Sequence, residues 1–281
     1  MDALVFGAGT IYREFYRPIL KSLGFRQHLV DPRLDSHSEL PSRDYDVVLV
    51  LSPPQAHFEN FQFLYEQKIK WKRLIVEKPA LVTRQQFLKT VGLFAHKKKS
   101  DICTVSPRRL SLAFSFLRAN ALLVKSIELK YGIQSKWTQM SASDAKYNSC
   151  VYDLGTHFFD AVQFALSNCV SGSAVVEYSK LSFNAFKVRY TIGSCNVSIS
   201  VSRASYYVNY LSITYVDGAK SILPLDLNDT VFSTGQPFMP KLDTTNAISE
   251  FLKFLNGEDS LLFSPMDQFY PIIELLDSVN D

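Results

Sequence analysis

The feature that most constrains this chain is an alternation, from residue 3 to residue 105, of short apolar runs with amphipathic stretches. The amphipathic stretches keep helical spacing, as from Ile11 to Leu23 and from His57 to Gln67. Strands that are apolar on both faces and alternate with helices indicate a parallel sheet covered on both sides. Right-handed crossovers then predict a doubly wound α/β domain that binds ligands at the carboxyl ends of its strands. The five apolar runs are Ala3–Phe6, His28–Val30, Asp46–Leu51, Arg73–Val76 and Asp101–Val105.

From about residue 120 the pattern changes to the two-residue alternation of half-buried strands. Asp217-Gly218 is a strong hairpin signal within this series. Helical spacing marks Leu154–Leu166, Asn246–Leu255 and Asp267–Val279. This part predicts an α+β domain with a mainly antiparallel open sheet. We therefore expect two domains, residues 1–118 and 119–281. The strand runs are Ser126–Tyr131, Leu181–Tyr190, Asn196–Arg203 and Tyr210–Val216.

Composition excludes several classes of protein. Hydrophobic residues make up 47% of the chain, which is too much apolar surface for a disordered protein. The net charge of +3 leaves no basic footprint for nucleic acid or an anionic membrane. The four cysteines are widely separated and form no metal or redox motif. No leader or membrane-spanning run stands out, so a cytoplasmic protein with reduced thiols is expected.

Gly7-Ala8-Gly9 follows the first strand and opens a helix, and the expected cofactor contacts at this turn are Gly7, Gly9, Thr10 and Ile11. Such a turn lets the backbone approach a pyrophosphate at the helix N-terminus. Asp31 follows 22 residues after Gly9, where a carboxylate can bind the adenosine ribose hydroxyls. Tyr12 occupies the position of the third glycine of the dinucleotide fingerprint. An ordinary strand–helix turn is the alternative, but these features in register favour dinucleotide binding. Arg33 is equally compatible with a 2′-phosphate contact and with an exposed strand end.

Two further motifs carry groups suited to proton transfer. Glu77-Lys78-Pro79 closes the fourth strand, and Asp153 and His157 share one face of a helix together with Asp160. A solvated Lys78, an N-capping Asp153 and a half-buried structural His157 are the alternatives. The Asp/His spacing has no third soft ligand nearby, so no metal site is predicted.

Together these motifs resemble the Gfo/Idh/MocA oxidoreductase family. The resemblance covers residues 1–110 and 148–166 by motif and the rest by architecture. It implies a nicotinamide-binding Rossmann domain with NAD or NADP as cofactor. It also implies that Lys78, His157 and Asp153 form a catalytic cluster, with His157 exchanging a proton. The matching segments are Gly7–Gly9 with Asp31, Asp46–His57, Ile75–Pro79 and Asp153–Asp160.

The same resemblance implies roles for the remaining site residues. Ser52, Pro53 and His57 would line the cofactor, Glu77 would lie near the nicotinamide ribose, and Arg109 would point toward the substrate. Asp31 favours NAD slightly, because it would repel a 2′-phosphate.

The expected reaction is hydride transfer between nicotinamide and a small substrate such as a sugar, nucleotide-sugar or polyol. Imine reduction in natural-product assembly and a non-catalytic, cofactor-binding regulator of the same fold are the alternatives. A homodimer or higher homo-oligomer is expected through the antiparallel sheet, on the basis of Tyr206, Tyr207 and Tyr210.

Overall fold

The computed structural model describes residues 1–30, 44–133, 149–167, 174–204, 209–225 and 244–280. The chain divides into two compact units, Met1–Val105 with Thr244–Tyr270, and Ser106–Asp243 with Pro271–Asp281. Residues 106–118 therefore group with the second unit and residues 244–270 with the first. The sequence pattern instead predicts residues 106–118 in the first domain and residues 244–270 in the second.

The first unit is built on a six-stranded sheet with the order β12-β5-β4-β3-β1-β2. Strands β1, β2, β3, β4 and β5 all pair in parallel with their neighbours in this group, whereas β12 is antiparallel to β5. Leu4, Val48 and Leu74 in the central strands are fully buried. The predicted parallel sheet is therefore confirmed, and β12 adds an edge strand. The bounds are β1 Asp2–Phe6, β2 Arg26–Val30, β3 Asp44–Val50, β4 Lys70–Val76, β5 Ile102–Val105 and β12 Phe263–Pro265.

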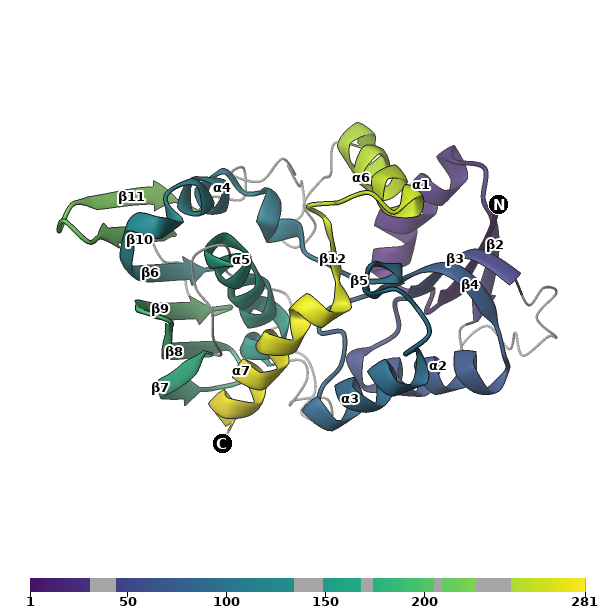
Figure 1. The fold of residues 1–281 in the computed structure, drawn as a ribbon, viewed down its shortest axis with the longest axis horizontal. Coiled ribbons are helices and arrows are strands. Elements are labelled where there is room, and N and C mark those ends of the chain that lie inside the picture. Colours follow the sequence, from purple (N-terminus) through teal and green to yellow (C-terminus); the bar gives the residue numbers. More distant parts are fainter. Residues whose placement is uncertain (31–43, 134–148, 168–173, 205–208, 226–243, 281) are drawn as a thin grey trace. The chain divides into compact units, whose positions relative to one another are not determined.

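Helices cover both faces of this sheet, with α1 and α6 on one side and α2 and α3 on the other (Figure 1). Thr83 caps α3 by accepting a hydrogen bond from the Gln86 amide at 3.2 Å. The first helical segment widens into a π-helical turn, Tyr12–Tyr16, just before Pro18. Proline lacks the amide that an α-helical bond requires, which accounts for the irregular turn before it. The bounds are α1 Arg17–Ser22, α2 Pro54–Glu66, α3 Arg84–Leu93 and α6 Thr244–Asn256.

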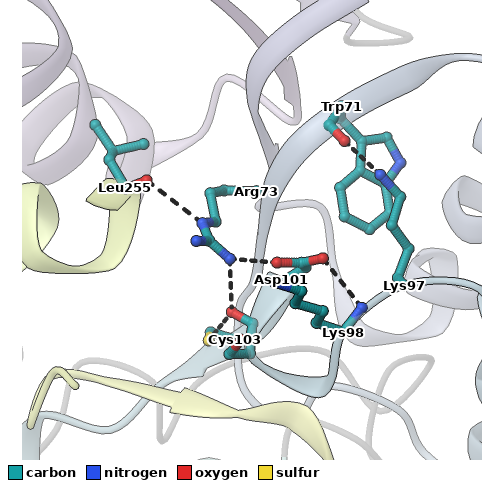
Figure 2. A network of polar contacts seen from close by, with 8 residues as sticks. Trp71, Arg73, Lys97, Lys98, Asp101, Cys103 and Leu255 are labelled. Atoms are coloured by element: carbon teal, nitrogen blue, oxygen red, sulfur yellow. Dashed lines mark hydrogen bonds and ion pairs between the residues drawn. The ribbon is translucent and has the colours of Figure 1, made fainter. Parts of the chain in front are cut away.

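An arginine of β4 holds the end of α6 against the sheet (Figure 2). Arg73 pairs with Asp101, and its Nε donates to the Leu255 carbonyl at 3.4 Å. The left-handed Gly257 (φ +79°) follows and lies beside the Arg73 guanidinium. A cation at a helix C-terminus is favourable. The left-handed backbone of Gly257 favours glycine at this position. These contacts and the pairing of β12 with β5 explain why residues 244–270 belong to the first unit.

The second unit is built on a six-stranded sheet with the order β11-β10-β6-β9-β8-β7. All neighbours are antiparallel except β6 and β9, which are parallel. Helix α5 (Thr156–Leu166) packs on one face, where Phe159 meets Phe186 at a centroid distance of 5.8 Å. The predicted mainly antiparallel sheet is confirmed. The bounds are β6 Val124–Gly132, β7 Val175–Leu181, β8 Ala185–Ile192, β9 Cys195–Ser202, β10 Tyr210–Tyr215 and β11 Lys220–Pro224.

Two local predictions in this unit have different outcomes. The Asp217-Gly218 turn joins β10 to β11, with Gly218 at φ +87° and its amide bonded to the Tyr215 carbonyl. The single strand expected over Leu181–Tyr190 is wrong, because Leu181 ends β7 and Ala185 begins β8. Ser182 bonds to both backbone groups of Ala185 and closes the turn between them. The remaining helices are α4 Leu112–Ala119 and α7 Tyr270–Asn280.

The face of this sheet that α5 leaves uncovered is mixed in character where it is described. Val175 and Tyr178 of β7 and Ile222 of β11 are exposed on it, and polar side chains lie between them. Lys187 and Arg189 of β8 are exposed, while Phe186, Val188 and Tyr190 between and beside them are buried. Tyr210 is half-buried and donates from its hydroxyl to Glu128 Oε1 at 2.9 Å. Tyr206 and Tyr207 lie outside the described residues. The three tyrosines on which the predicted oligomer is based therefore do not test it. Assembly through this sheet stays a prediction.

In the part of the chain that the structure describes, no helix combines the length and apolar character needed to cross a bilayer. Cys103, Cys150 and Cys195 are buried and are not joined by disulfide bonds in the described structure, and Cys169 lies outside the described residues.

Candidate functional site

The turn after β1 is shaped by a close approach to the loop after β3. Gly7 has φ +91°, and a Cβ there would lie 2.8 Å from the Ser52 amide nitrogen and 2.9 Å from the Leu51 carbonyl. The Gly7 amide donates to the Val30 carbonyl of β2 at 3.0 Å. Both the left-handed backbone and the contact exclude a side chain. Gly7 is therefore required by the fold itself.

Gly9 differs, because a Cβ built on it would have no heavy atom within 4 Å. Its carbonyl accepts the first helical bond, from the Arg13 amide at 3.1 Å. Thr10, the first helical residue, is exposed and Ile11 is half-buried. The amides at this helix start have no partner within the helix, as at any helix N-terminus. The Gly7–Ile11 segment therefore presents an open backbone surface suited to an anion.

Tyr12, in the place of the third fingerprint glycine, is buried and points toward β2. Its hydroxyl donates to Gln27 Oε1 at 2.6 Å. The helix thus accommodates the large side chain by packing it along the neighbouring strand. Asp31 and Arg33, which follow β2 and were expected to contact the ribose, lie outside the described residues.

The loops after β3 and β4 are tied together by His57, which is fully buried at the start of α2. Its Nε2 lies 2.7 Å from the Ser52 carbonyl, and its Nδ1 lies 3.1 Å from the carbonyls of Pro79 and Ala80. Burial lowers the pKa of the imidazole, an effect that the facing carbonyls partly offset. Both ring nitrogens face backbone groups, so His57 positions the two loops and has no nitrogen directed at a ligand.

Other contacts keep these loops in place. The Asn60 side chain donates to Ser52 Oγ at 2.6 Å, and the Glu77 amide donates to the Val50 carbonyl at 2.9 Å. Ser52 and Lys78 are half-buried, and Pro53 is exposed. The Lys78–Pro79 peptide bond is cis. Gly7–Ile11, Ser52–Pro53 and Glu77–Lys78 are therefore neighbours at the carboxyl edge of the first sheet.

Glu77 connects this edge to the first helix. The fully buried Tyr16 hydroxyl lies 3.5 Å from Glu77 Oε1, and the Lys78 amide donates to Oε2 at 3.2 Å. Desolvation raises the pKa of the Glu77 carboxyl, opposed by the Lys78 charge and these two hydrogen bonds. Burial, and then the neighbouring Glu77, raise the pKa of Tyr16 well above its usual value. Tyr16 is therefore a permanent donor to this carboxyl group.

The second motif lies in the second unit, where a π-helical turn (Val151–Gly155) leads into α5. Asp153 and His157 are both partly exposed, whereas their neighbours on this segment are largely buried. Gly155 lets the helix approach β8, because a Cβ there would lie 3.2 Å from the Phe186 ring. The sequence therefore places the two polar side chains at the surface of an otherwise apolar segment.

Arg203, which the sequence reasoning missed, stands beside Asp153. It is 1% exposed, and its Nη1 lies 3.4 Å from Asp153 Oδ2. Its Nη2 donates to the Phe183 carbonyl at 2.8 Å. The Asp153 carboxylate therefore has a permanent cation as a partner. The two residues are 50 positions apart, so no local pattern connects them.

Arg109 does not take the position expected for a substrate-binding residue. It is buried and makes two hydrogen bonds to Asp160, from Nε to Oδ2 at 2.9 Å and from Nη2 to Oδ1 at 2.6 Å. The same guanidinium lies 4.4 Å from the centroid of the Phe164 ring. Arg109 and Asp160 thus form an interior ion pair that joins the Pro107–Leu110 turn to α5.

Lys78 belongs to the first unit, whereas Asp153 and His157 belong to the second, so their meeting stays a prediction. Within the described ranges, no group of three or more His, Cys, Asp or Glu side chains is arranged to hold a metal ion.

Neither a family model nor a curated protein matches the chain in sequence. Solved structures match it along nearly its whole length at low identity. The WlbA (WbpB) dehydrogenase from Thermus thermophilus, in complex with NAD and UDP-GlcNAcA, has a TM-score of 0.69 at 16% identity, with 100% of this chain and 95% of that chain covered.

Two other dehydrogenases are similar to the same degree. UDP-N-acetylglucosamine 3-dehydrogenase GnnA from Acidithiobacillus ferrooxidans has a TM-score of 0.66 at 14% identity, covering 99% of this chain and 96% of that chain. A myo-inositol dehydrogenase from Corynebacterium glutamicum has a TM-score of 0.66 at 14% identity, with 100% and 95% covered. The chain therefore has the two-part fold found in these dehydrogenases.

Proposed function

We propose that this chain is an NAD(P)-dependent oxidoreductase acting on a small hydroxyl or carbonyl compound. The observation that carries the proposal is the meeting of three loops, Gly7–Ile11, Ser52–Pro53 and Glu77–Lys78, at one edge of a parallel sheet. Ligands of doubly wound sheets bind at this edge. The similar solved structures are dehydrogenases, and one of them was crystallised with NAD.

The residues at this edge fit a dinucleotide. Gly9 leaves its side of the helix start open, so a pyrophosphate has room to reach the amides of Thr10 and Ile11. Gly7 keeps the turn close to Ser52, which narrows the distance between the loops after β1 and β3. Bound there, NAD(P) would supply a hydride acceptor or donor at the nicotinamide ring.

The loops after β3 and β4 would orient the bound NAD(P). Ser52 and Pro53 flank it, and Glu77 accepts a ribose hydroxyl, with Tyr16 and the Lys78 amide holding the carboxyl in place. His57 contributes indirectly, because its contacts with the Ser52 and Pro79 carbonyls fix the backbone of both loops. In this arrangement His57 is a positioning residue and not a cofactor ligand.

His157 is proposed as the group that exchanges the substrate proton. A histidine titrates near neutrality, as a reversible proton donor should. Asp153 lies one turn earlier and orients the imidazole, while Arg203 holds the Asp153 carboxylate. Lys78 polarises the substrate oxygen from the end of β4.

The proposed substrates are sugars, nucleotide sugars and polyols, the classes on which the similar dehydrogenases act by name. Turnover is tested by following NADH and NADPH oxidation with panels of keto-sugars and cyclic imines. Turnover of a keto-sugar that is lost in His157→Asn supports the proposal. Turnover of imines alone supports imine reduction, and cofactor binding without turnover supports a regulator.

A further inference from the structure

Arg108 is the neighbour of the buried Arg109 in the Pro107–Leu110 turn, yet its surroundings are different. Its guanidinium carbon lies 5.0 Å from the centroid of the Tyr131 ring and 5.2 Å from that of Phe158. Its Nη2 donates to the Tyr131 hydroxyl at 3.2 Å. Both rings are buried, at 1% and 0% exposure, whereas Arg108 itself is partly exposed. Two fixed rings and a hydroxyl therefore hold this cation in one place.

The charge of Arg108 has no carboxylate partner among the described residues, whereas that of Arg109 is neutralised by Asp160. A guanidinium has five N–H donors, and the phenol of Tyr131 uses one of them. The aromatic faces favour the cation and restrict its movement. A guanidinium that is already fixed loses little entropy when it binds the two oxygens of a carboxylate or phosphate.

The turn that carries Arg108 packs against α5, the helix that carries the proposed proton donor His157. Phe158, one of the rings beneath the guanidinium, directly follows His157 in α5. Asp160, which pairs with Arg109 of the same turn, lies three positions after His157 and therefore on the same face of α5. The Pro107–Leu110 turn thus packs on the part of α5 that carries His157. Ser106, at the start of the same turn, adds a buried hydroxyl that has no hydrogen-bond partner in the described structure.

We propose that Arg108 binds an anionic group, a carboxylate or a phosphate, on the substrate that His157 acts on. This inference rests on the proposed function and narrows its substrate class to acidic sugars, sugar phosphates or nucleotide sugars. The competing explanation is that Arg108 only covers the Tyr131 and Phe158 rings with its side-chain stem.

The test measures binding directly, by calorimetric titration of the full chain with D-glucuronate, D-glucose 6-phosphate and D-glucose, with and without NADH. Arg108→Met keeps the apolar stem and removes the charge, and Arg108→Lys keeps the charge and removes the planar fork. Arg118→Met is the matched control, because Arg118 also lies on a ring, 4.0 Å from the Phe164 centroid. Thermal melting of each variant establishes that it is folded.

Hydrogen bonds to charged groups are strong enough that Arg108→Met should weaken binding of the recognised anion roughly 10- to 100-fold. Arg108→Lys should lie between Arg108→Met and the wild type, and the Arg118→Met control should match the wild type. The anion with the larger loss identifies the group, carboxylate or phosphate. Equal binding of an anion by wild type and Arg108→Met, or no binding of either anion by the wild type, would overturn the proposal. Sugar binding measured without NADH does not depend on the dinucleotide site. A failure seen there therefore concerns Arg108 and not the dinucleotide assignment.

Discussion

The two glycines of the first turn should respond oppositely to the same substitution. In Gly7→Ala the new methyl group meets backbone atoms of Leu51 and Ser52 at 2.8–2.9 Å, at a φ of +91°. The left-handed backbone costs about 1–2 kcal/mol for a residue with a Cβ. Overpacking against a rigid backbone costs about 1–3 kcal/mol more. The free energy of unfolding should therefore fall by about 2–5 kcal/mol, which lowers Tm by roughly 4–20 °C in a protein of this size.

Gly9→Ala is the matched control, because its methyl group meets nothing within 4 Å. Its Tm should equal that of the wild type or exceed it slightly, since alanine restricts the unfolded chain. If a pyrophosphate lies against Gly9, the methyl group should weaken NADH binding roughly 5- to 150-fold through overpacking. Calorimetric melting and NADH fluorescence measure the two effects separately. An unchanged Tm for Gly7→Ala, or a large fall in Tm for Gly9→Ala, would refute the structural reasoning.

Three further predictions follow from the site. Because burial holds the Glu77 pKa above its ordinary value of 4.5, the folded protein keeps a proton that the unfolded chain has lost, and stability falls as pH rises above about that value. Glu77→Gln should remove this fall and raise Tm at pH 7; equal pH dependence of melting in both proteins would contradict it. Asp160→Asn removes the negative charge that neutralises the buried Arg109 guanidinium and should cost about 3–5 kcal/mol in urea unfolding. A loss below about 1 kcal/mol would contradict this prediction. His157→Asn should lower turnover about 10²–10⁴-fold with NADH affinity nearly unchanged; near wild-type turnover would make His157 structural.

The central strands of the first sheet could be predicted because they are apolar on both faces. Val47–Val50 and Leu74–Val76 are fully buried, so their sequences carry a continuous signal. The three-residue β12 carries none, because it is an edge strand that ends in Pro265. Its partner β5 lies far earlier in the chain, and this pairing determines where residues 244–270 belong.

The candidate site shows the same division between local and distant information. Gly7 and the Glu77–Lys78 turn could be found because strand ends and glycines are local signals. The partners of Arg109 and Asp153 could not, because Asp160 and Arg203 come from segments about 50 residues away. The sequence resemblance places His57 along the cofactor, whereas the structure buries it completely. Only the structure shows that backbone carbonyls face both of its ring nitrogens.

The central claim, that the first unit binds a nicotinamide dinucleotide, is tested most directly by titrating the chain with NADH and with NADPH. The enhancement of nicotinamide fluorescence reports binding. The account predicts saturable binding of at least one, with NADH tighter if Asp31 contacts the ribose and NADPH tighter if Arg33 meets a 2′-phosphate. Absence of saturable binding for both nucleotides would contradict the assignment of the Gly7–Ile11 turn and of the function built on it.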